Sequence, residues 1–90
     1  MEWFVYIIHC SDQSFYTGIT TDVARRFEQH AVLKGAKYFR GRRPLQVVYL
    51  ETGHNRSSAA KRENEIKKIS RKEKWRIIAS DNNKIAEFAL

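Results

Sequence analysis

The sequence predicts an α+β fold in which a small three-stranded antiparallel sheet is flanked by helices, in the order β-β-α-β-α-α. Three observations predict it. Two runs rich in β-branched and aromatic residues stand near the start of the chain, joined by a short turn. A third such run follows a basic loop. Elsewhere, residues that cap helices stand before segments whose apolar residues recur at helical spacing. Strands gathered early with helices behind them are typical of a layered α+β domain.

The first two strands are predicted to form a hairpin. Residues 3–8 are apolar at every position, which is typical of a central strand covered on both faces. Residues 11–14 have turn chemistry, and residues 15–19 return as the second strand. Gly18 packs no side chain inside that strand, so it indicates a β-bulge or the close approach of another group.

The third strand, residues 45–50, follows a basic loop over residues 34–43 that ends at Pro44. Residues 52–55 have the composition of a loop. Capping side chains then mark the helices. The first predicted helix follows capping residues at 20–22 and ends at about residue 33, and the second begins at Ser57 or Ser58 and ends at about residue 69. Ser70 caps the third, whose apolar residues are 75 and 77–79. A short last helix over residues 84–89 follows a cap at Asp81.

Length and composition limit the classes of protein to which the chain can belong. The chain has 90 residues, of which 42% are hydrophobic, so residues 1–90 are expected to form one domain with one core. The longest apolar run is far shorter than the roughly 18 residues of a membrane-spanning helix. Cys10 is the only cysteine, which excludes a disulfide framework within the chain and a cysteine metal cage. We therefore expect a cytoplasmic protein with no membrane partner.

Positive charge is concentrated in one part of the chain. The formal net charge is +7, from 17 Lys and Arg against 10 Asp and Glu. Residues 34–76 hold 14 basic and 4 acidic residues, a net +10, whereas the rest of the chain holds 3 and 6, a net −3. Such asymmetry is typical of proteins that bind nucleic acid. The alternative is that the basic residues only keep a small protein soluble.

The first predicted helix carries polar side chains on its apolar face. At about 100° per residue, Arg26 and His30 share a face with Val23 and Phe27, whereas Arg25 points away. The structural explanation is an arginine whose stem packs along the core and a histidine satisfied by a neighbour. This helix alone favours the structural explanation over a functional site.

The second predicted helix places a carboxylate on its apolar stripe. Ala59, Glu63 and Ile66 fall on one face, and Glu65 points elsewhere. A carboxylate in that position is costly unless it is paired or binds a cation. It therefore indicates either an ion pair with Arg26 or a nearby lysine, or one ligand of a hard divalent ion such as Mg²⁺.

Tyr6 and Tyr16 fall in the two strands of the hairpin. A tyrosine in a strand more often packs than catalyses. Its phenol has a pKa of about 10, so it becomes a useful base only where cations or a metal-bound hydroxide assist it. The two rings share a face of the sheet only if the register pairs residues whose numbers add to an even total.

Together these residues resemble the motifs of the GIY-YIG nuclease family. Residues 5–7, Val-Tyr-Ile, hold Tyr6 at the place of the tyrosine in the first family triplet, and residues 16–18, Tyr-Thr-Gly, are similar to the second triplet. Arg26 and a later helical glutamate complete the pattern. Residues 16–27 resemble the small single-domain UPF0213 group, which is related to the nuclease module of bacterial excision repair. The resemblance covers about residues 3–79.

The resemblance implies the GIY-YIG fold and metal-dependent, endonuclease-type hydrolysis of phosphodiester bonds in nucleic acid. The implied substrate is DNA in repair or recombination, and the implied cofactor is one Mg²⁺ or Mn²⁺ ion. Carried over position by position, the family motifs assign catalytic roles to Tyr6, Tyr16, Arg26 and His30, metal binding to Glu63, and a structural role to Gly18.

Several positions depart from the family pattern. Phe4 stands where the first triplet has glycine, and Thr17 stands where the second has isoleucine; both are packing positions. Ile19 stands where some members have a lysine, which implies weaker stabilisation of the phosphate. A later asparagine of many family nucleases has no convincing match at Asn82 or Asn83.

The basic loop is predicted to hold nucleic acid beside this site. Its cations would follow the phosphate backbone, and Tyr38 and Phe39 would stack on bases. No segment has the pattern of a major-groove reader, so binding is expected to lack sequence specificity. The residues assigned to this surface are Lys34, Lys37, Tyr38, Arg40, Arg42, Arg43 and Lys67.

Two alternatives to catalysis stay open. In one, the same fold is a nucleic-acid-binding module without hydrolysis. In the other, Tyr6, Arg26 and Glu63 form only a buried polar network, and no divalent ion binds. Small relatives usually gain targeting from an additional DNA-binding domain, so a nuclease of this length is expected to depend on a partner protein or a structured substrate, or to discriminate poorly between substrates.

Overall fold

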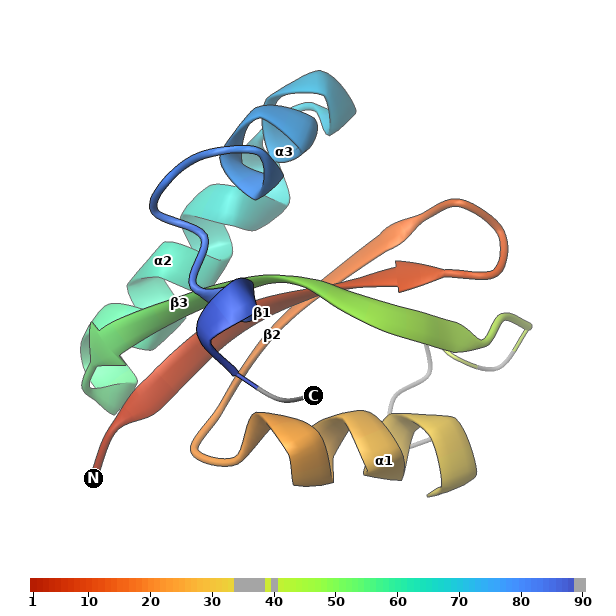
Figure 1. The fold of residues 1–90 in the computed structure, drawn as a ribbon, viewed down its shortest axis with the longest axis horizontal. Helices are drawn as coiled ribbons and strands as arrows, with labels where there is room; N and C mark the ends of the chain where they lie inside the picture. The colour runs from red at the N-terminus through yellow and green to blue at the C-terminus, as the bar shows by residue number, and fades with distance from the viewer. Residues whose placement is uncertain (34–38, 40, 89–90) are drawn as a thin grey trace.

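The sheet has three antiparallel strands in the order β2-β1-β3 within the residues that the computed structural model describes, 1–33, 39 and 41–88 (Figure 1). The first strand along the chain is therefore the central one. The elements are, in chain order, β1 (Trp3–Cys10), β2 (Phe15–Thr20), α1 (Val23–Leu33), β3 (Pro44–His54), α2 (Arg56–Lys68), α3 (Arg71–Ile78) and the 3₁₀ turn η2 (Ile85–Glu87). The predicted α+β class and element order are confirmed.

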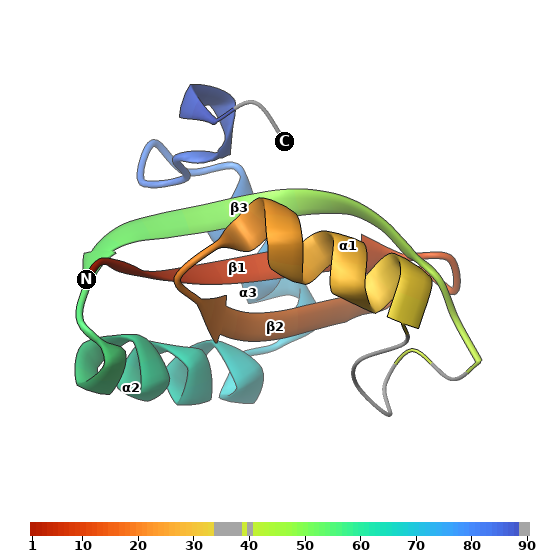
Figure 2. The ribbon, with the colours of Figure 1, turned by 90° about the horizontal axis from the view of Figure 1, so that it is seen from below.

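Helices cover both faces of this sheet. Figure 2 shows α1 across the front of the sheet, α3 behind it and α2 beside β2. The apolar cluster that includes Tyr6 and Ile8 packs against α1, and the cluster that includes Val5 and Ile7 packs against α2. These four residues of β1 are buried, because successive side chains of a central strand enter opposite covered faces. None of the described helices is long and apolar enough to cross a membrane.

The β1–β2 hairpin has a regular antiparallel register. Tyr6 pairs with Gly18, and Ile8 pairs with Tyr16. The paired numbers add to an even total, so Tyr6 and Tyr16 lie on the same face of the sheet. The predicted alternative of a bulge at Gly18 is wrong, because the register shifts of β1 occur in its pairing with β3 instead.

β3 is longer than predicted. It runs from Pro44 to His54, so most of the loop expected at residues 52–55 belongs to the strand. Pairing extends it, because Trp3 at the start of β1 pairs with His54. Gly53 has a φ of 80°, a conformation that glycine adopts without strain, and it allows the strand to end in a turn toward α2.

Side-chain caps begin α2 and α3. The predicted cap of α2 at Ser57 or Ser58 is wrong, because Asn55 is the N-cap and Ser58 completes a capping box. The backbone N–H of Ser58 donates to Asn55 Oδ1 over 2.8 Å, and the backbone N–H of Asn55 donates to Ser58 Oγ over 3.1 Å. Ser70 caps α3 as predicted, accepting from the backbone N–H of Glu73.

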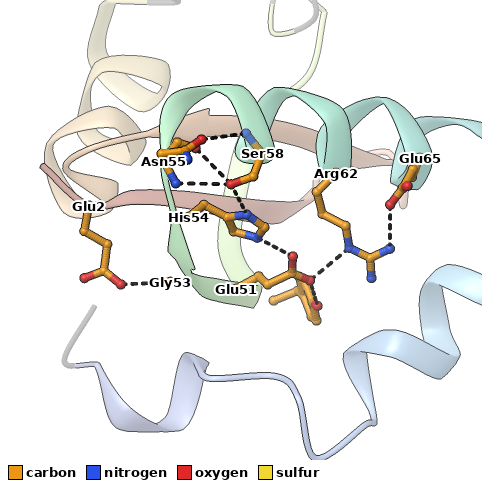
Figure 3. A network of polar contacts seen from close by, with 9 residues as sticks. Glu2, Glu51, Gly53, His54, Asn55, Ser58, Arg62 and Glu65 are labelled. Atoms are coloured by element: carbon orange, nitrogen blue, oxygen red, sulfur yellow. Dashed lines mark hydrogen bonds and ion pairs between the residues drawn. The ribbon is translucent and has the colours of Figure 1, made fainter.

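A polar network joins the end of β3 to α2 (Figure 3). Glu51 accepts hydrogen bonds from Tyr49 Oη and His54 Nε2, each over 2.6 Å, and from Arg62 Nε over 3.0 Å. The other ring nitrogen of His54 lies 2.9 Å from Ser58 Oγ. The network holds α2, the helix of the candidate metal ligand, at a defined place beside the sheet.

The end of the chain packs along the edge of β3. The predicted last helix is a single 3₁₀ turn, η2, whose N-cap residue is Lys84, so the expected cap at Asp81 is wrong. Asn83 attaches this segment to the sheet. Its side chain hydrogen-bonds the backbone of two β3 residues, the end of α3 and the start of η2: Leu50 N, Val48 O, Ile78 O and Ile85 N.

Candidate active site

Tyr6 lies directly against the backbone of β2 at Gly18. A Cβ atom at position 18 would lie 2.5 Å from Tyr6 Oη and 2.7 Å from Tyr6 Cζ, closer than such atoms approach in proteins. The absence of a side chain at Gly18 therefore leaves the space that the phenol occupies. The close approach predicted for this glycine is confirmed.

Tyr6 and His30 form a buried hydrogen bond between β1 and α1. Tyr6 Oη lies 3.0 Å from His30 Nε2, and each residue is 1% exposed. Burial raises the pKa of Tyr6 far above its ordinary value. Burial, and then the positive charge of Arg26, lower the pKa of His30 to about 4. Both side chains are therefore uncharged near neutral pH.

The second ring nitrogen of His30 has no hydrogen-bond partner among the described residues. Nδ1 is buried, and a buried polar atom left unpaired costs about 1–3 kcal/mol. The structural explanation expected a histidine satisfied by a neighbour, and Tyr6 satisfies Nε2 but leaves Nδ1 unexplained. An unpaired buried group in a folded protein calls for an explanation, and a functional site is one of them.

Aromatic rings enclose the imidazole of His30. The Tyr16 ring lies 5.1 Å away in a T-shaped arrangement, and the Phe39 ring lies 4.6 Å away. Phe39 is 2% exposed, so the prediction that it stacks on bases is wrong. Its ring packs into the core from inside a basic loop. The sequence carried no periodic signal for this, since Phe39 belongs to no predicted helix or strand.

Arg26 lies on the same face of α1 as His30 and is half-buried, whereas Arg25 is exposed, as predicted. Its Nη1 donates to Gln29 Oε1 over 3.1 Å, a partner that helical spacing alone did not single out. The charge of Arg26, together with a hydrogen bond, lowers the pKa of Tyr6 against the larger opposing effect of burial. Arg26 is therefore close enough to act on both uncharged groups.

Glu63 lies on α2, and its charge acts on Tyr6. Its side chain is 20% exposed and stands between Ala59 and Ile66, which are buried, so the predicted helix face is confirmed. The negative charge of Glu63 contributes to the raised pKa of Tyr6. Glu63 Oε2 also lies 3.2 Å from Nζ of Lys67, so the ion pair with a nearby lysine is present.

These donors fit a divalent ion whose shell is completed by other ligands. Mg²⁺ typically binds through one or two carboxylates and keeps several waters or substrate phosphates. Glu63 supplies one such carboxylate, partly open to solvent. Across the described residues there is no group of three or more His, Cys, Asp or Glu that could hold a metal. The residues therefore fit an open site and not a cage made entirely of protein ligands.

The basic surface predicted beside this site is described only in part, since Lys34, Lys37, Tyr38 and Arg40 lie outside the described residues. Arg42 Nε pairs with Asp12 Oδ2 over 3.2 Å, and Arg42 Nη1 donates to Ser14 Oγ over 3.3 Å, which attaches the segment before β3 to the β1–β2 turn. Arg43 is exposed. Lys67 is 52% exposed and is held by Glu63.

A cavity of about 450 Å³ lies away from these side chains. It opens between α1, the start of β3 and the end of the chain, and no candidate catalytic residue lines it. Its lining is Ala24, Phe27, Leu45, Gln46, Val47, Ile85, Ala86 and Phe88. The polar cluster is therefore recognised by its chemistry and not by the volume of a pocket.

Tyr6, Tyr16, His30 and Arg26 meet beside Gly18, and the charge of Glu63 on α2 acts on the same phenol. Residues 2–76 of the chain match the family described as the GIY-YIG catalytic domain. The chain belongs to the GIY-YIG family, whose domains have a nuclease-type function. Within the family it is similar to proteins of the UPF0213 group, both in sequence and in structure.

The similarity extends across bacterial and archaeal relatives. A UPF0213 protein of Desulfotalea psychrophila is 55% identical over 69 residues, which are 76% of this chain and 63% of that relative, less than two thirds of its length. A UPF0213 protein of Haloquadratum walsbyi is 51% identical over 74 residues, 82% of this chain and 83% of that relative.

Two solved structures share the fold. The UPF0213 protein of Bacillus halodurans is 43% identical, with a TM-score of 0.58 over 91% of this chain and 87% of that one. A protein from E. faecalis is 38% identical, with a TM-score of 0.60 over 84% of this chain and 81% of that one.

Proposed function

We propose that this protein hydrolyses phosphodiester bonds of nucleic acid, with DNA as the substrate and one Mg²⁺ or Mn²⁺ ion as the cofactor. One observation carries the proposal: a buried, uncharged tyrosine–histidine pair, an arginine and a half-buried carboxylate converge where the family motifs lie. The buried His30 Nδ1, which has no hydrogen-bond partner among the described residues, also supports a functional site over a purely structural network.

In this proposal Tyr6 and His30 accept the proton of the attacking water. Arg26 donates toward the phenol oxygen, which leaves the Tyr6 O–H free to donate to His30 Nε2 over 3.0 Å. Tyr6 then takes a proton from water as it passes its own to the uncharged imidazole. Arg26 also lowers the pKa of His30, and the negative charge of a bound phosphate opposes that effect.

Arg26 stabilises the charge that develops on the phosphorus oxygens. Its guanidinium offers a planar set of N–H donors that matches two phosphate oxygens, a geometry that lysine lacks. It is half-buried, where an ion pair with phosphate is stronger than in bulk water. Gln29 accepts from its Nη1 and holds the side chain in one orientation before substrate binds.

Glu63 would hold the divalent ion with one carboxylate, and Tyr16 lines the site beside His30. The ion supplies positive charge that polarises the scissile phosphate and stabilises the leaving 3′-oxygen. The products are then a 5′-phosphate and a 3′-hydroxyl. Lys67, displaced from Glu63, becomes available to a neighbouring phosphate of the same strand.

The test is cleavage of labelled plasmid, branched DNA, nicked DNA and RNA in Mg²⁺ or Mn²⁺, with EDTA as the control. Arg26→Ala and Glu63→Gln are each expected to lower the rate at least about 100-fold, the loss typical of removing one stabilising group. Arg25→Ala and Glu65→Gln remove the same charges from exposed neighbours on the same helices and are expected to keep the rate.

Circular dichroism melts of the four variants separate catalysis from folding. Equal rates in Arg25→Ala and Arg26→Ala, with both proteins folded, contradict the proposed role of Arg26. Unfolding of Arg26→Ala or Glu63→Gln assigns that residue to structure instead.

A binding module without hydrolysis is the second candidate. The observation that favours it is the ion pair between Glu63 and Lys67, which already neutralises the single carboxylate of the site. This candidate predicts nucleic-acid binding that falls steeply with salt and needs no divalent ion. Binding that is equal in EDTA and in Mg²⁺, with no cleavage of any substrate, would select it.

A further inference from the structure

A second group of aromatic and basic side chains lies on the other face of the sheet, where α3 meets the start of β2. The rings of Phe15 and Trp75 are in T-shaped contact, with centroids 5.1 Å apart. The Arg71 guanidinium lies 4.8 Å from the Phe15 centroid, and Arg71 donates to the carbonyl of Gln13 in the β1–β2 turn. We call Phe15, Arg71 and Trp75 the α3 platform.

Packing explains only part of this platform. Phe15 packs against the apolar cluster that also receives Ile77 and Ile78 from α3. Trp75 covers the outer edge of Phe15 and remains 47% exposed. A large aromatic side chain that is half open to solvent leaves ring surface available to a ligand.

Positive charge surrounds the exposed ring. Arg71 and Lys72 lie four and three residues before Trp75, so they flank it on the helix surface, and both are exposed. α3 holds four basic residues, Arg71, Lys72, Lys74 and Arg76, and a single acidic one, Glu73. Among the ion pairs of the described residues, none includes Arg71 or Lys72.

We propose that the α3 platform binds a single-stranded segment of nucleic acid, with one unpaired base stacked on Trp75 and phosphates held by Arg71 and Lys72. An exposed aromatic ring beside cations that no described acidic residue neutralises is the combination that recognises single strands, because every base has a π-face and every nucleotide carries a phosphate. Bases inside a duplex are already stacked and cannot reach the ring.

The platform and the candidate active site flank the same edge of the sheet. Phe15 and Tyr16 are neighbours in β2, and their side chains enter opposite faces. β2 is an edge strand, so a flexible single strand can pass around it from one face to the other. The preferred substrate would then carry an unpaired segment next to the cleaved bond, and this part alone rests on the proposed function.

Tryptophan fluorescence tests binding without any cleavage. The chain has two tryptophans, so in the Trp3→Phe variant all tryptophan fluorescence comes from Trp75. The full chain is titrated in EDTA with a thymidine oligonucleotide of about twelve nucleotides and with a blunt duplex of equal length. The single strand is expected to quench the emission, and the duplex is expected to leave it nearly unchanged.

Fluorescence anisotropy of the labelled single strand measures the affinity of variants. Trp75→Ala is expected to bind about tenfold more weakly, and Trp75→Phe to lose less, because a smaller ring still stacks. Phe88→Ala is the matched control, since Phe88 is an exposed aromatic, 39% exposed, whose ring contacts Phe4 and not the platform, and its loss is expected to leave affinity unchanged. Thermal melts confirm that each variant is folded.

Two results would overturn the platform: emission that the single strand does not quench, or a folded Trp75→Phe and Trp75→Ala pair that binds as the unaltered protein does. Either result stands whatever the cleavage assays find. Absence of cleavage in every substrate contradicts the proposed hydrolysis and leaves the platform intact, because the quenching of Trp75 is measured in EDTA and needs no cleavage.

Discussion

The phenol of Tyr6 occupies the volume that a side chain at residue 18 would need. Tyr6 and Gly18 are direct partners in the β1–β2 ladder, and a Cβ built on Gly18 would lie 2.5 Å from Tyr6 Oη. The same phenol reaches His30 over 3.0 Å. One glycine therefore sets the position of the group on which the candidate site is centred.

Replacing this glycine tests that relationship. Gly18→Ala is expected to destabilise the protein by about 1–3 kcal/mol, because the added methyl forces the buried phenol out of place. Gly41→Ala is the control, since a Cβ there meets nothing within 4 Å. Urea unfolding gives both values. A Gly18→Ala protein as stable as Gly41→Ala would show that the ring moves without cost.

The low pKa of His30 predicts a loss of stability in mild acid. Its pKa falls from 6.5 to about 4 on folding, so between these values the unfolded chain binds a proton that the folded protein does not. The free energy of unfolding therefore decreases as pH falls, by about 2 kcal/mol between pH 7 and pH 5. Urea unfolding across this range is expected to show a flatter dependence in His30→Gln. Parallel curves for the two proteins would contradict the assignment.

The ion pair between Glu63 and Lys67 competes with a divalent ion. An exposed pair at this helical spacing is worth about 0.3–0.5 kcal/mol, so Lys67→Ala is expected to tighten Mn²⁺ binding about twofold. Paramagnetic broadening of amide signals measures the affinity. Lys68→Ala is the control, because it removes an exposed lysine one residue away. Weaker Mn²⁺ binding in Lys67→Ala than in Lys68→Ala would count against Glu63 as the ligand.

Glu51 is the centre of the network in Figure 3. Burial, and then the bond to Glu51, raise the pKa of Tyr49 to about 12, and Tyr49 is 1% exposed. Glu51→Ala leaves this buried hydroxyl and two further donors unpaired, so a loss of about 2–3 kcal/mol is expected in urea unfolding. Glu65→Ala removes one exposed ion pair with Arg62 and is expected to cost at most about 0.5 kcal/mol. Equal losses of stability in the two variants would show that the polar network does not depend on Glu51.

Asn83 is expected to matter for stability and not for catalysis. Its side chain makes four hydrogen bonds to backbone groups, two of them in β3. Asn83→Ala is expected to cost about 2–3 kcal/mol and to speed hydrogen exchange of the Leu50 amide. Asn82→Ala, at an exposed neighbour, is expected to change neither. A loss of nucleic-acid cleavage in a folded Asn83→Ala protein would instead give this asparagine a role in the site.

Local pattern was sufficient to find the polar residues of the site and insufficient to find their partners. Arg26 and His30 stood out because each occupies an apolar helix face, and their half-buried and buried positions confirm that face. Phe39 was assigned to bases and packs on His30 instead. A residue in an irregular loop has no period, so its burial depends on contacts that sequence distance conceals.

The boundaries of the strands and helices also divide into those that local sequence predicts and those that depend on distant contacts. Residues 3–8 formed a buried central strand because their composition suits no other place in the fold. The end of β3 was missed, because His54 is a strand residue only through its pairing with Trp3. Asn55, and not a serine, is the N-cap of α2, because β3 extends to His54 and places Asn55 directly before the first residue of the helix.

Sequence by itself determined the strands and helices and the polar residues on apolar faces. These depend on interactions between near neighbours along the chain, which composition and period report. Only the tertiary structure decided the register that puts Tyr6 and Tyr16 on one face and the ion pair of Glu63 with Lys67. It also decided that His30 Nδ1 has no partner among the described residues and that Trp75 is left half open. Those facts arise from the packing of distant segments, in which burial and pairing are set by whole elements meeting across the sheet.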